Sequence, residues 1–172
     1  MSAVELFPGH VPPLGLGTIP HGDVALYTGL ELLRRLIDGH YPAPSIGARM
    51  NFALVEAEEG RAVFHGVPSD QHLNPLGTVH GGWAATLLDS ALGCAVHTTM
   101  AKGEAYTTIE FKVNLIRPIT PATGLVACEG KVVSRGRTTA VSEARLTDQN
   151  GKLLAFGTET CAIFPVGNLA PR

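Results

Sequence analysis

One apolar stretch, residues 82–100, constrains the fold most, because Asp89 is its only Asp, Glu, Lys or Arg. Leucine, alanine and valine recur along it at spacings of three and four residues, which predicts a helix. Since apolar side chains occupy nearly every side of this helix, we expect it to be buried almost completely. A carboxylate on such a helix is costly unless it is paired, hydrogen-bonded or beside water.

The segments around this helix have the alternating pattern of strands. A hairpin is predicted around Glu59-Gly60, with alternating apolar residues at Met50, Phe52 and Leu54 before the turn. Alternation within 105–118 and in segments 122–134, 137–147 and 152–164 predicts four more strands, in meander order. The Asn150-Gly151 pair favours a tight turn. Because tight turns join antiparallel strands, we expect an α+β fold whose antiparallel sheet curls around the helix.

Ahead of this unit lie two segments of different character. Residues 1–22 are rich in proline and glycine, which predicts an arm without regular elements. Residues 23–45 are expected to hold an N-terminal helix over 23–38, capped by Asp23 and ending at Gly39, and a connector. Its apolar stripe is Leu26, Leu30, Leu33 and Ile37. The main domain is expected at 46–165, and a short tail at 166–172.

Composition excludes several classes of protein. A net charge of −2 and a pI near 6.4 argue against a general nucleic-acid binder. Charged residues are only 16%, against a norm of about 25%, which favours surface buried in an oligomer. Three separated cysteines match neither a disulfide framework nor a zinc site, and fit a reducing compartment. With no secretory signal at the N-terminus and no sufficiently apolar span, we expect a cytoplasmic protein without membrane contact.

The start of the apolar helix and its lone acid are candidate site residues. Gly81 and Gly82 lie where free N–H groups and the positive end of the helix dipole gather. Glycine lets a ligand oxygen approach closely, so these amides suit a carbonyl that becomes tetrahedral; the alternative is a flexible helix entry. Asp89 is either a general base or nucleophile with a pKa raised by desolvation, or a structural acid held by a backbone or hydroxyl donor.

Spacing bears on how these groups act together. Gly81 and Asp89 are eight residues apart, or about 12 Å along one helix. A base and an oxyanion donor must both lie within about 3 Å of the reacting group. One helix cannot satisfy both, whereas two antiparallel copies can. If both residues act, the site is shared between two chains of a dimer.

Other polar residues flank this motif or lie apart from it. His80 is either a structural or a catalytic residue, and it lacks partners at metal-ligand spacing, so no metal is expected. Asn74 either orients a carbonyl or caps its loop. Arg135-Gly136-Arg137 is the densest basic point, and is either a solvated turn or a clamp for the phosphates of a nucleotide-bearing ligand. Phosphate-loop, dinucleotide-binding and serine-hydrolase motifs are absent from the sequence, and no cofactor is expected.

From about residue 46 to 164 the sequence resembles the hotdog-fold thioesterases, within them the phenylacetate-pathway (PaaI-type) acyl-CoA thioesterases. The resemblance is carried by Asn74-Pro75-Leu76-Gly77-Thr78-Val79-His80-Gly81-Gly82, by Leu87-Leu88-Asp89, by the segment from Tyr106 to Pro118 and by Gly136-Arg137. It implies a six-stranded antiparallel sheet around a long helix, dimers that often form tetramers, and hydrolysis of an acyl-CoA substrate.

The resemblance also implies roles for individual residues. The Gly81 amide, helped by Asn74, would polarise the thioester carbonyl, and His80 would position substrate and loop. Asp89 of the other chain would activate water or attack directly. The family's hydroxyl residue on the following strand matches Thr108. Two alternatives stay open: a hotdog hydratase or dehydratase using His80 with Asp89, and a non-catalytic acyl-CoA binding module.

Overall fold

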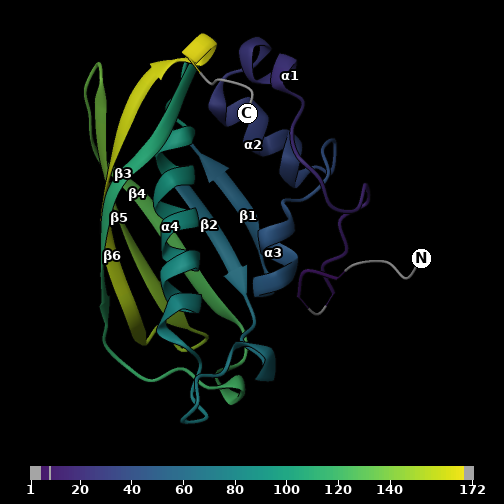
Figure 1. Ribbon diagram of the computed structural model, residues 1–172, viewed down its shortest axis with the longest axis vertical. Coiled ribbons are helices and arrows are strands. Elements are labelled where there is room, and N and C mark those ends of the chain that lie inside the picture. Colours follow the sequence, from purple (N-terminus) through teal and green to yellow (C-terminus); the bar gives the residue numbers. More distant parts are fainter. Residues whose placement is uncertain (1–4, 8, 169–172) are drawn as a thin grey trace.

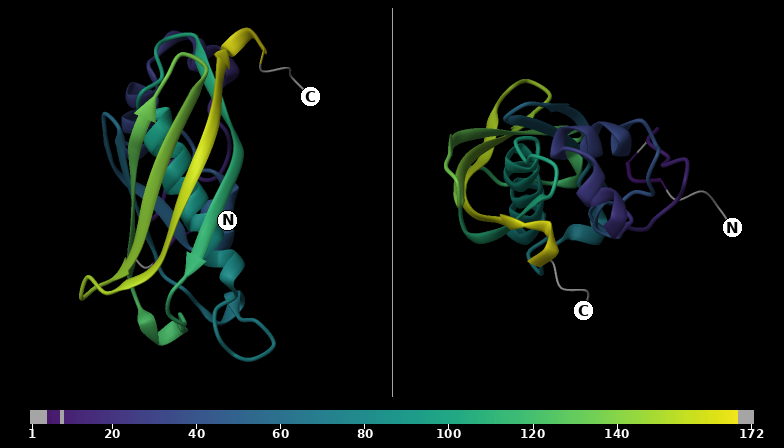
Figure 2. Two further views of the ribbon diagram at one scale, coloured as in Figure 1. Left: turned by 90° about the vertical axis from the view of Figure 1, so that its left-hand side faces the viewer. Right: turned by 90° about the horizontal axis from the view of Figure 1, so that it is seen from above.

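The computed structural model describes residues 5–7 and 9–168, and consists of a six-stranded antiparallel sheet wrapped around one long helix (Figures 1 and 2). The helix is α4, Gly81–His97, close to the predicted span. The strands are β1 (Phe52–Glu58), β2 (Arg61–Gly66), β3 (Glu104–Leu115), β4 (Val126–Arg135), β5 (Thr139–Asp148) and β6 (Leu153–Pro165). The predicted α+β fold class is confirmed, as is the turn at Glu59-Gly60.

The predicted order of the last four strands is wrong. The sheet runs β1-β2-β4-β5-β6-β3, so only β4, β5 and β6 form a meander, and β3 lies at the edge beside β6. Tight turns join β4 to β5 and β5 to β6, but ten residues, which include the short helix Pro121–Thr123, separate β3 from β4. This connection passes the start of α4, where the Val79 amide donates to the Ile119 carbonyl. A connection of that length does not oblige its two strands to pair.

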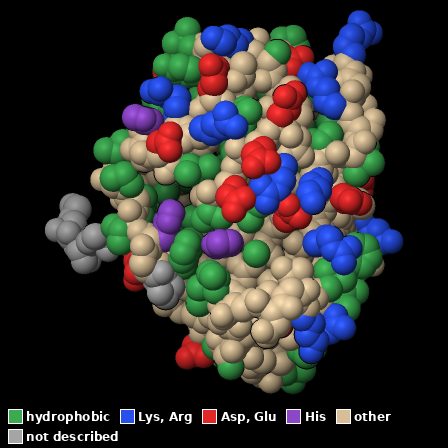
Figure 3. Space-filling model, turned by 180° about the vertical axis from the view of Figure 1, so that it is seen from behind, with side chains coloured by type: hydrophobic (Ala, Val, Ile, Leu, Met, Phe, Trp, Pro, Cys, Tyr) green, Lys and Arg blue, Asp and Glu red, His purple; other side chains and the backbone are tan. Residues whose placement is uncertain are grey.

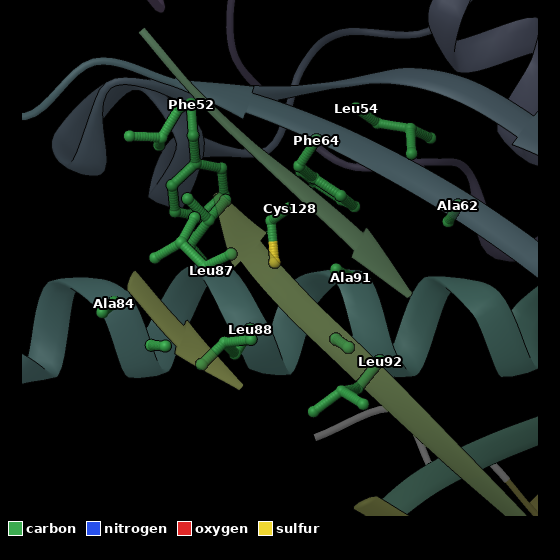
Figure 4. Close-up of a cluster of buried hydrophobic side chains, with 14 of the residues drawn as sticks. Phe52, Leu54, Ala62, Phe64, Ala84, Leu87, Leu88, Ala91, Leu92 and Cys128 are labelled. Atoms are coloured by element: carbon green, nitrogen blue, oxygen red, sulfur yellow. The ribbon is translucent and has the colours of Figure 1, made fainter. Parts of the chain in front are cut away.

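The core lies between α4 and the concave face of the sheet (Figure 4). Leu87, Leu88, Ala91 and Leu92 of α4 are 0% exposed. Across from them are the apolar side chains of β1, β2 and β4, including the edge-to-face pair Phe52 and Phe64. The prediction of a helix buried nearly all round is therefore confirmed.

The single helix predicted over 23–38 is wrong, because two helices occupy this segment. They are α1, His21–Leu26, and α2, Gly29–Ile37. Thr28 ends the stripe, since its side chain accepts from the Glu31 amide and the Glu31 side chain accepts from the Thr28 amide, a capping box that starts a new helix. Asp23 is not a cap but accepts a hydrogen bond from the Tyr41 hydroxyl. The predicted end of the helical segment at Gly39 is confirmed, and Gly39 has a φ of +76°.

A third short helix, α3 (Ser45–Met50), was not predicted and ends at Asn51 in the left-handed conformation. Helices α2 and α3 pack against β1, the first edge of the sheet (Figure 1). The described part of the arm holds no helix before α1, but Leu6 is buried against Ala43 and Ala53. Residues 1–4, 8 and 169–172, which belong to the predicted arm and tail, lie outside the described residues. The short helices Asp70–His72 and Val166–Asn168 complete the elements.

Charges on the outside are of both signs. Arg61 on β2 forms ion pairs with Glu56 on β1 and Glu129 on β4. The rear face of the molecule carries acidic and basic side chains intermixed among apolar ones (Figure 3). None of the described helices is both long and apolar enough to cross a membrane.

We expect Gly130→Ala to destabilise the fold. A Cβ at Gly130 would overlap the backbone of Ala91, so α4 would have to move away from β4. Overpacking of this kind lowers the free energy of unfolding by about 1–3 kcal/mol, measurable by urea denaturation. Gly22→Ala is the control, because nothing lies within 4 Å of a Cβ there. Equal stability of the two variants would contradict the close contact.

Candidate functional site

The first turn of α4 presents one open backbone amide. The Gly82 amide donates to Nδ1 of His80 at 2.9 Å, and the Trp83 amide donates to the His80 carbonyl. Within residues 5–7 and 9–168 the Gly81 amide has no such acceptor. Gly81 therefore keeps a free N–H at the positive end of the helix dipole. Of the two glycines predicted to meet substrate, Gly81 is free to donate, whereas Gly82 is engaged by the cap.

The loop that precedes this turn is held in shape by side-chain hydrogen bonds. The Asn74 side-chain oxygen accepts from the amides of Leu76 and Thr78, at 2.9 and 3.3 Å, and its nitrogen donates to Thr78 Oγ1 at 2.8 Å. Asn74 thus caps its own loop, one of the two roles weighed from the sequence. A primary amide has two N–H groups, so one remains for a ligand. His80 is exposed and caps α4.

Asp89 lies at the middle of α4, half-buried, and lines a cavity of about 370 Å³. The nearby hydroxyls do not hold it, because Ser90 donates to the Thr86 carbonyl and Thr86 donates to the Gly82 carbonyl. Burial raises the pKa of the Asp89 carboxyl, and the neighbouring Glu159 side chain opposes that rise. A carboxylate whose pKa is raised is a better proton acceptor near neutral pH.

Thr108 reaches the same cavity because of an irregularity in β3. Simple alternation would place Thr108 on one face with Glu110 and Lys112. The register with β6 shifts between Thr108 and Glu110, so that Thr108 lies opposite Cys161 and Phe111 lies opposite Glu159. Both β6 partners are buried beneath α4, and Thr108 and Asp89 line one cavity.

Glu159 on β6 is a site residue that sequence reasoning missed. Its side chain is 0% exposed, and its Oε1 accepts from Thr108 Oγ1 at 3.0 Å and from Cys161 Sγ at 2.9 Å. Burial raises the pKa of this carboxyl to about 7. The signal was present in the sequence: Glu159 shares its strand parity with Gly157, Cys161 and Ile163, which face the core.

The structure does not bring all predicted residues together within one chain. Gly81 and Asp89 lie on one helix, about 12 Å apart. The turn that holds Arg135, Gly136 and Arg137 lies elsewhere, beside the start of β3, where Arg135 pairs with Glu104 at 2.5 Å. The Gly136 amide closes this turn on the Thr139 carbonyl. Arg137 is exposed. No cluster of metal-ligating side chains occurs in the described part of the chain.

The cavity draws its walls from two parts of the chain. The central helix and β3 contribute Asp89, Cys94, Tyr106 and Thr108, and the first hairpin contributes Phe52, Leu54 and Phe64. The N-terminal segment adds mostly apolar residues, among them Leu6, Val11, Pro12, Tyr41 and Ile46. The carboxylate therefore opens onto a largely apolar space.

Comparison with known proteins identifies related thioesterases and esterases. The family model described as "Thioesterase superfamily" matches residues 76–155. The chain is 30% identical to human acyl-coenzyme A thioesterase 13 over 108 residues, 62% of this chain and 76% of that protein. It is 32% identical to a putative esterase of Caenorhabditis elegans over 112 residues, 64% of this chain and only 65% of that protein's length.

A solved structure resembles a larger share of the chain. It is a putative thioesterase, a phenylacetic acid degradation-related protein from Ralstonia eutropha JMP134, 27% identical with a TM-score of 0.69. The alignment covers 76% of this chain and 98% of that one. The family model, the acyl-coenzyme A thioesterase relative and the six-stranded sheet around α4 agree: the chain belongs to the thioesterase superfamily.

Proposed function

We propose that this chain hydrolyses the thioester of an acyl-CoA to the free acid and CoA. Its family is that of thioester hydrolases, and the substrate is suggested by its likeness to acyl-coenzyme A thioesterase 13. The observation that carries the proposal is the open Gly81 amide at the start of the helix whose middle bears Asp89. These are the electrophilic donor and the base that acyl transfer to water requires.

In the proposed reaction, the Gly81 amide donates to the thioester oxygen and stabilises the negative charge that develops there. Asp89 accepts a proton from a water molecule as the water oxygen bonds to the carbonyl carbon. Collapse of the tetrahedral species breaks the carbon–sulfur bond, and the proton held by Asp89 passes to the leaving thiolate. The apolar cavity beside Asp89 suits the acyl group. Asn74 and His80 hold the loop before Gly81 in place through their hydrogen bonds.

The about 12 Å between Gly81 and Asp89 makes this site one that two chains share. The surface at β3 supports such pairing, because β3 is an edge strand with twelve residues and exposed apolar side chains. The strand at the other edge, β1, has α2 and α3 packed against it. Exposed Leu115 reaches Gly81, and Leu76, 90% exposed, lies in the preceding loop. A partner that extends the sheet at β3 would bury this surface and approach Gly81.

The alternative activities have less support. A hydratase would move a proton at carbon with His80 and Asp89, but Nδ1 of His80 is engaged in capping α4. A binding module would not need a carboxyl whose pKa is raised beside the acyl cavity. Release of free thiol from a panel of acyl-CoA substrates separates hydrolysis from both, since neither alternative yields CoA.

We expect Asp89→Asn to lower turnover by roughly 10²–10⁴-fold, the usual contribution of a positioned proton-transfer group. Substrate binding is retained because Gly81 is untouched, and stability holds or rises because a partly buried carboxylate is removed. Turnover and melting temperature are measured on one preparation. Asp70→Asn, at an exposed acid, is the matched control. Near-wild-type turnover in well-folded Asp89→Asn would remove Asp89 from the mechanism.

We expect the protein to sediment as at least a dimer, and Ile109→Lys to weaken both assembly and activity. A lysine at this exposed apolar position of the β3 edge opposes pairing with a second chain. Val133→Lys, at an equally exposed position of β4, is the control.

Mixing Asp89→Asn chains with Gly81→Val chains tests directly whether two chains share the site. Half of the dimers then contain one intact site of two, so about a quarter of the activity returns. A fully active monomer, or no recovery on mixing, would contradict the shared site.

For the basic turn, we expect Arg135→Ala and Arg137→Ala to raise KM more than they lower kcat, by roughly tenfold for a lost phosphate contact. Salt should reduce the effect, since exposed charges are screened. Arg135→Ala also breaks the ion pair with Glu104, so Arg137→Ala is the cleaner variant. An acyl-pantetheine substrate, which lacks the nucleotide, should be unaffected. An equal loss with this substrate would make the arginines structural.

A further inference from the structure

Glu159 is buried in a way that the reaction above does not explain. Its side chain is completely excluded from solvent. Thr108 and Cys161 both donate to Oε1, but Oε2 is buried without a donor among the described residues. A buried ionised carboxylate with an unpaired oxygen is strongly disfavoured. Either the charge or the missing partner must therefore be accounted for.

Protonation of Glu159 accounts for both. A neutral carboxylic acid has one O–H donor, and with two donors on Oε1 its proton belongs on Oε2. The available acceptor is the carboxylate of Asp89, the nearest neighbour whose charge acts on Glu159. Asp89 borders the cavity, whereas Glu159 lies behind it, so the charge is less costly on Asp89 than on Glu159. The pair thus holds one proton, on the more deeply buried acid.

The other groups around the pair do not supply a compensating charge. The titratable neighbours are Cys94 on α4, Tyr106 and Glu110 on β3, and Cys161 on β6, all acidic groups. Burial raises the pKa of Cys94 to about 12 and raises those of Tyr106 and Cys161, so all three stay neutral at neutral pH. Glu110 is exposed and accepts from Thr160. On β5, Ser142 lies opposite Glu159 in register, and its buried hydroxyl also lacks a partner in the described chain.

We infer that Glu159 is a positioning residue for the proposed hydrolysis: as a neutral acid it donates a hydrogen bond from Oε2 to Asp89 and keeps that carboxylate ionised and directed at the cavity. Thr108 takes part in the same hydrogen-bonded arrangement. Its hydroxyl donates to Oε1 of Glu159 and thereby leaves Oε2 to carry the proton. This inference rests on the proposed function for its catalytic consequence. The proton-sharing pair itself does not depend on that function.

A specific pH dependence follows. Burial raises the pKa of Glu159 to about 7, so above that pH the donor is lost and two negative charges face each other. We expect kcat/KM to fall on the alkaline side with an apparent pKa near 7 that belongs to the pair. Glutamine at 159 can accept from Thr108 and Cys161 and donate to Asp89, but it cannot ionise. Glu159→Gln should therefore stay active and lose the alkaline fall.

The test compares three variants over pH with one acyl-CoA. Glu159→Ala removes the donor and should lower kcat by roughly 10–100-fold, the range for a hydrogen bond to a charged group, with KM little changed. Glu159→Gln should restore most of that loss. Glu143→Gln, at an exposed glutamate on β5, is the matched control with a wild-type profile. If well-folded Glu159→Gln is as impaired as Glu159→Ala, or keeps the alkaline fall, the inference is overturned.

A second measurement does not use activity. Because folding raises the Glu159 pKa from 4.5 to about 7, the folded state binds a proton that the unfolded chain has released. Stability should therefore fall as the pH rises from about 4.5 to about 7 and level off above it. Glu159→Gln should remove this part of the slope, and an unchanged slope would refute the neutral acid. If no acyl-CoA is hydrolysed but the slope behaves as expected, the proposed function fails while the shared proton stands.

Discussion

The rest of the structure depends on how closely α4 lies against the sheet. At Gly130 of β4 there is no room for a side chain, because a Cβ would overlap the backbone of Ala91. This contact holds the apolar side of α4 in the curve of the sheet and leaves the side with Asp89 toward β3 and β6. Burial of the carboxyl, and thus its raised pKa, follows from the packing that stabilises the fold.

The edge strand β3 links that packing to assembly. Its irregular register carries Thr108 to the buried face, where it bonds Glu159 behind Asp89. Among the described residues no strand pairs with the outer edge of β3, and the end of β3 brings Leu115 against Gly81. In the proposed dimer, a disturbance of this strand therefore reaches the base and the oxyanion donor together. An arrangement of this kind makes catalysis and association difficult to separate by mutation.

Sequence patterns sufficed for features that short segments determine. The span and burial of α4, the turn at Glu59-Gly60 and the helix end near Gly39 follow from local periodicity and backbone preference. The edge position of β3 does not, because a ten-residue connection leaves its pairing open. The capping box at Thr28 outweighed an unbroken apolar stripe, since local hydrogen bonds decide where a helix starts. Glu159 was missed because polarity alone suggests the solvent side, whereas the strand's parity places it inside.

The candidate site also has two parts, one inside and one outside the segment that the family model matches. The groups proposed for chemistry, Gly81 and Asp89, lie within the matched family segment 76–155. Much of the apolar wall of the cavity lies outside that segment, in the hairpin and the N-terminal elements. Hydrogen bonds join those elements to the region of α4. The Gly29 amide donates to the Met100 carbonyl beyond the end of α4, and Trp83 Nε1 of α4 donates to the Met50 carbonyl. The segment before β1 is thus part of the cavity's structure, and the space beside the carboxylate is shaped by a region of the chain that does not supply the proposed chemistry.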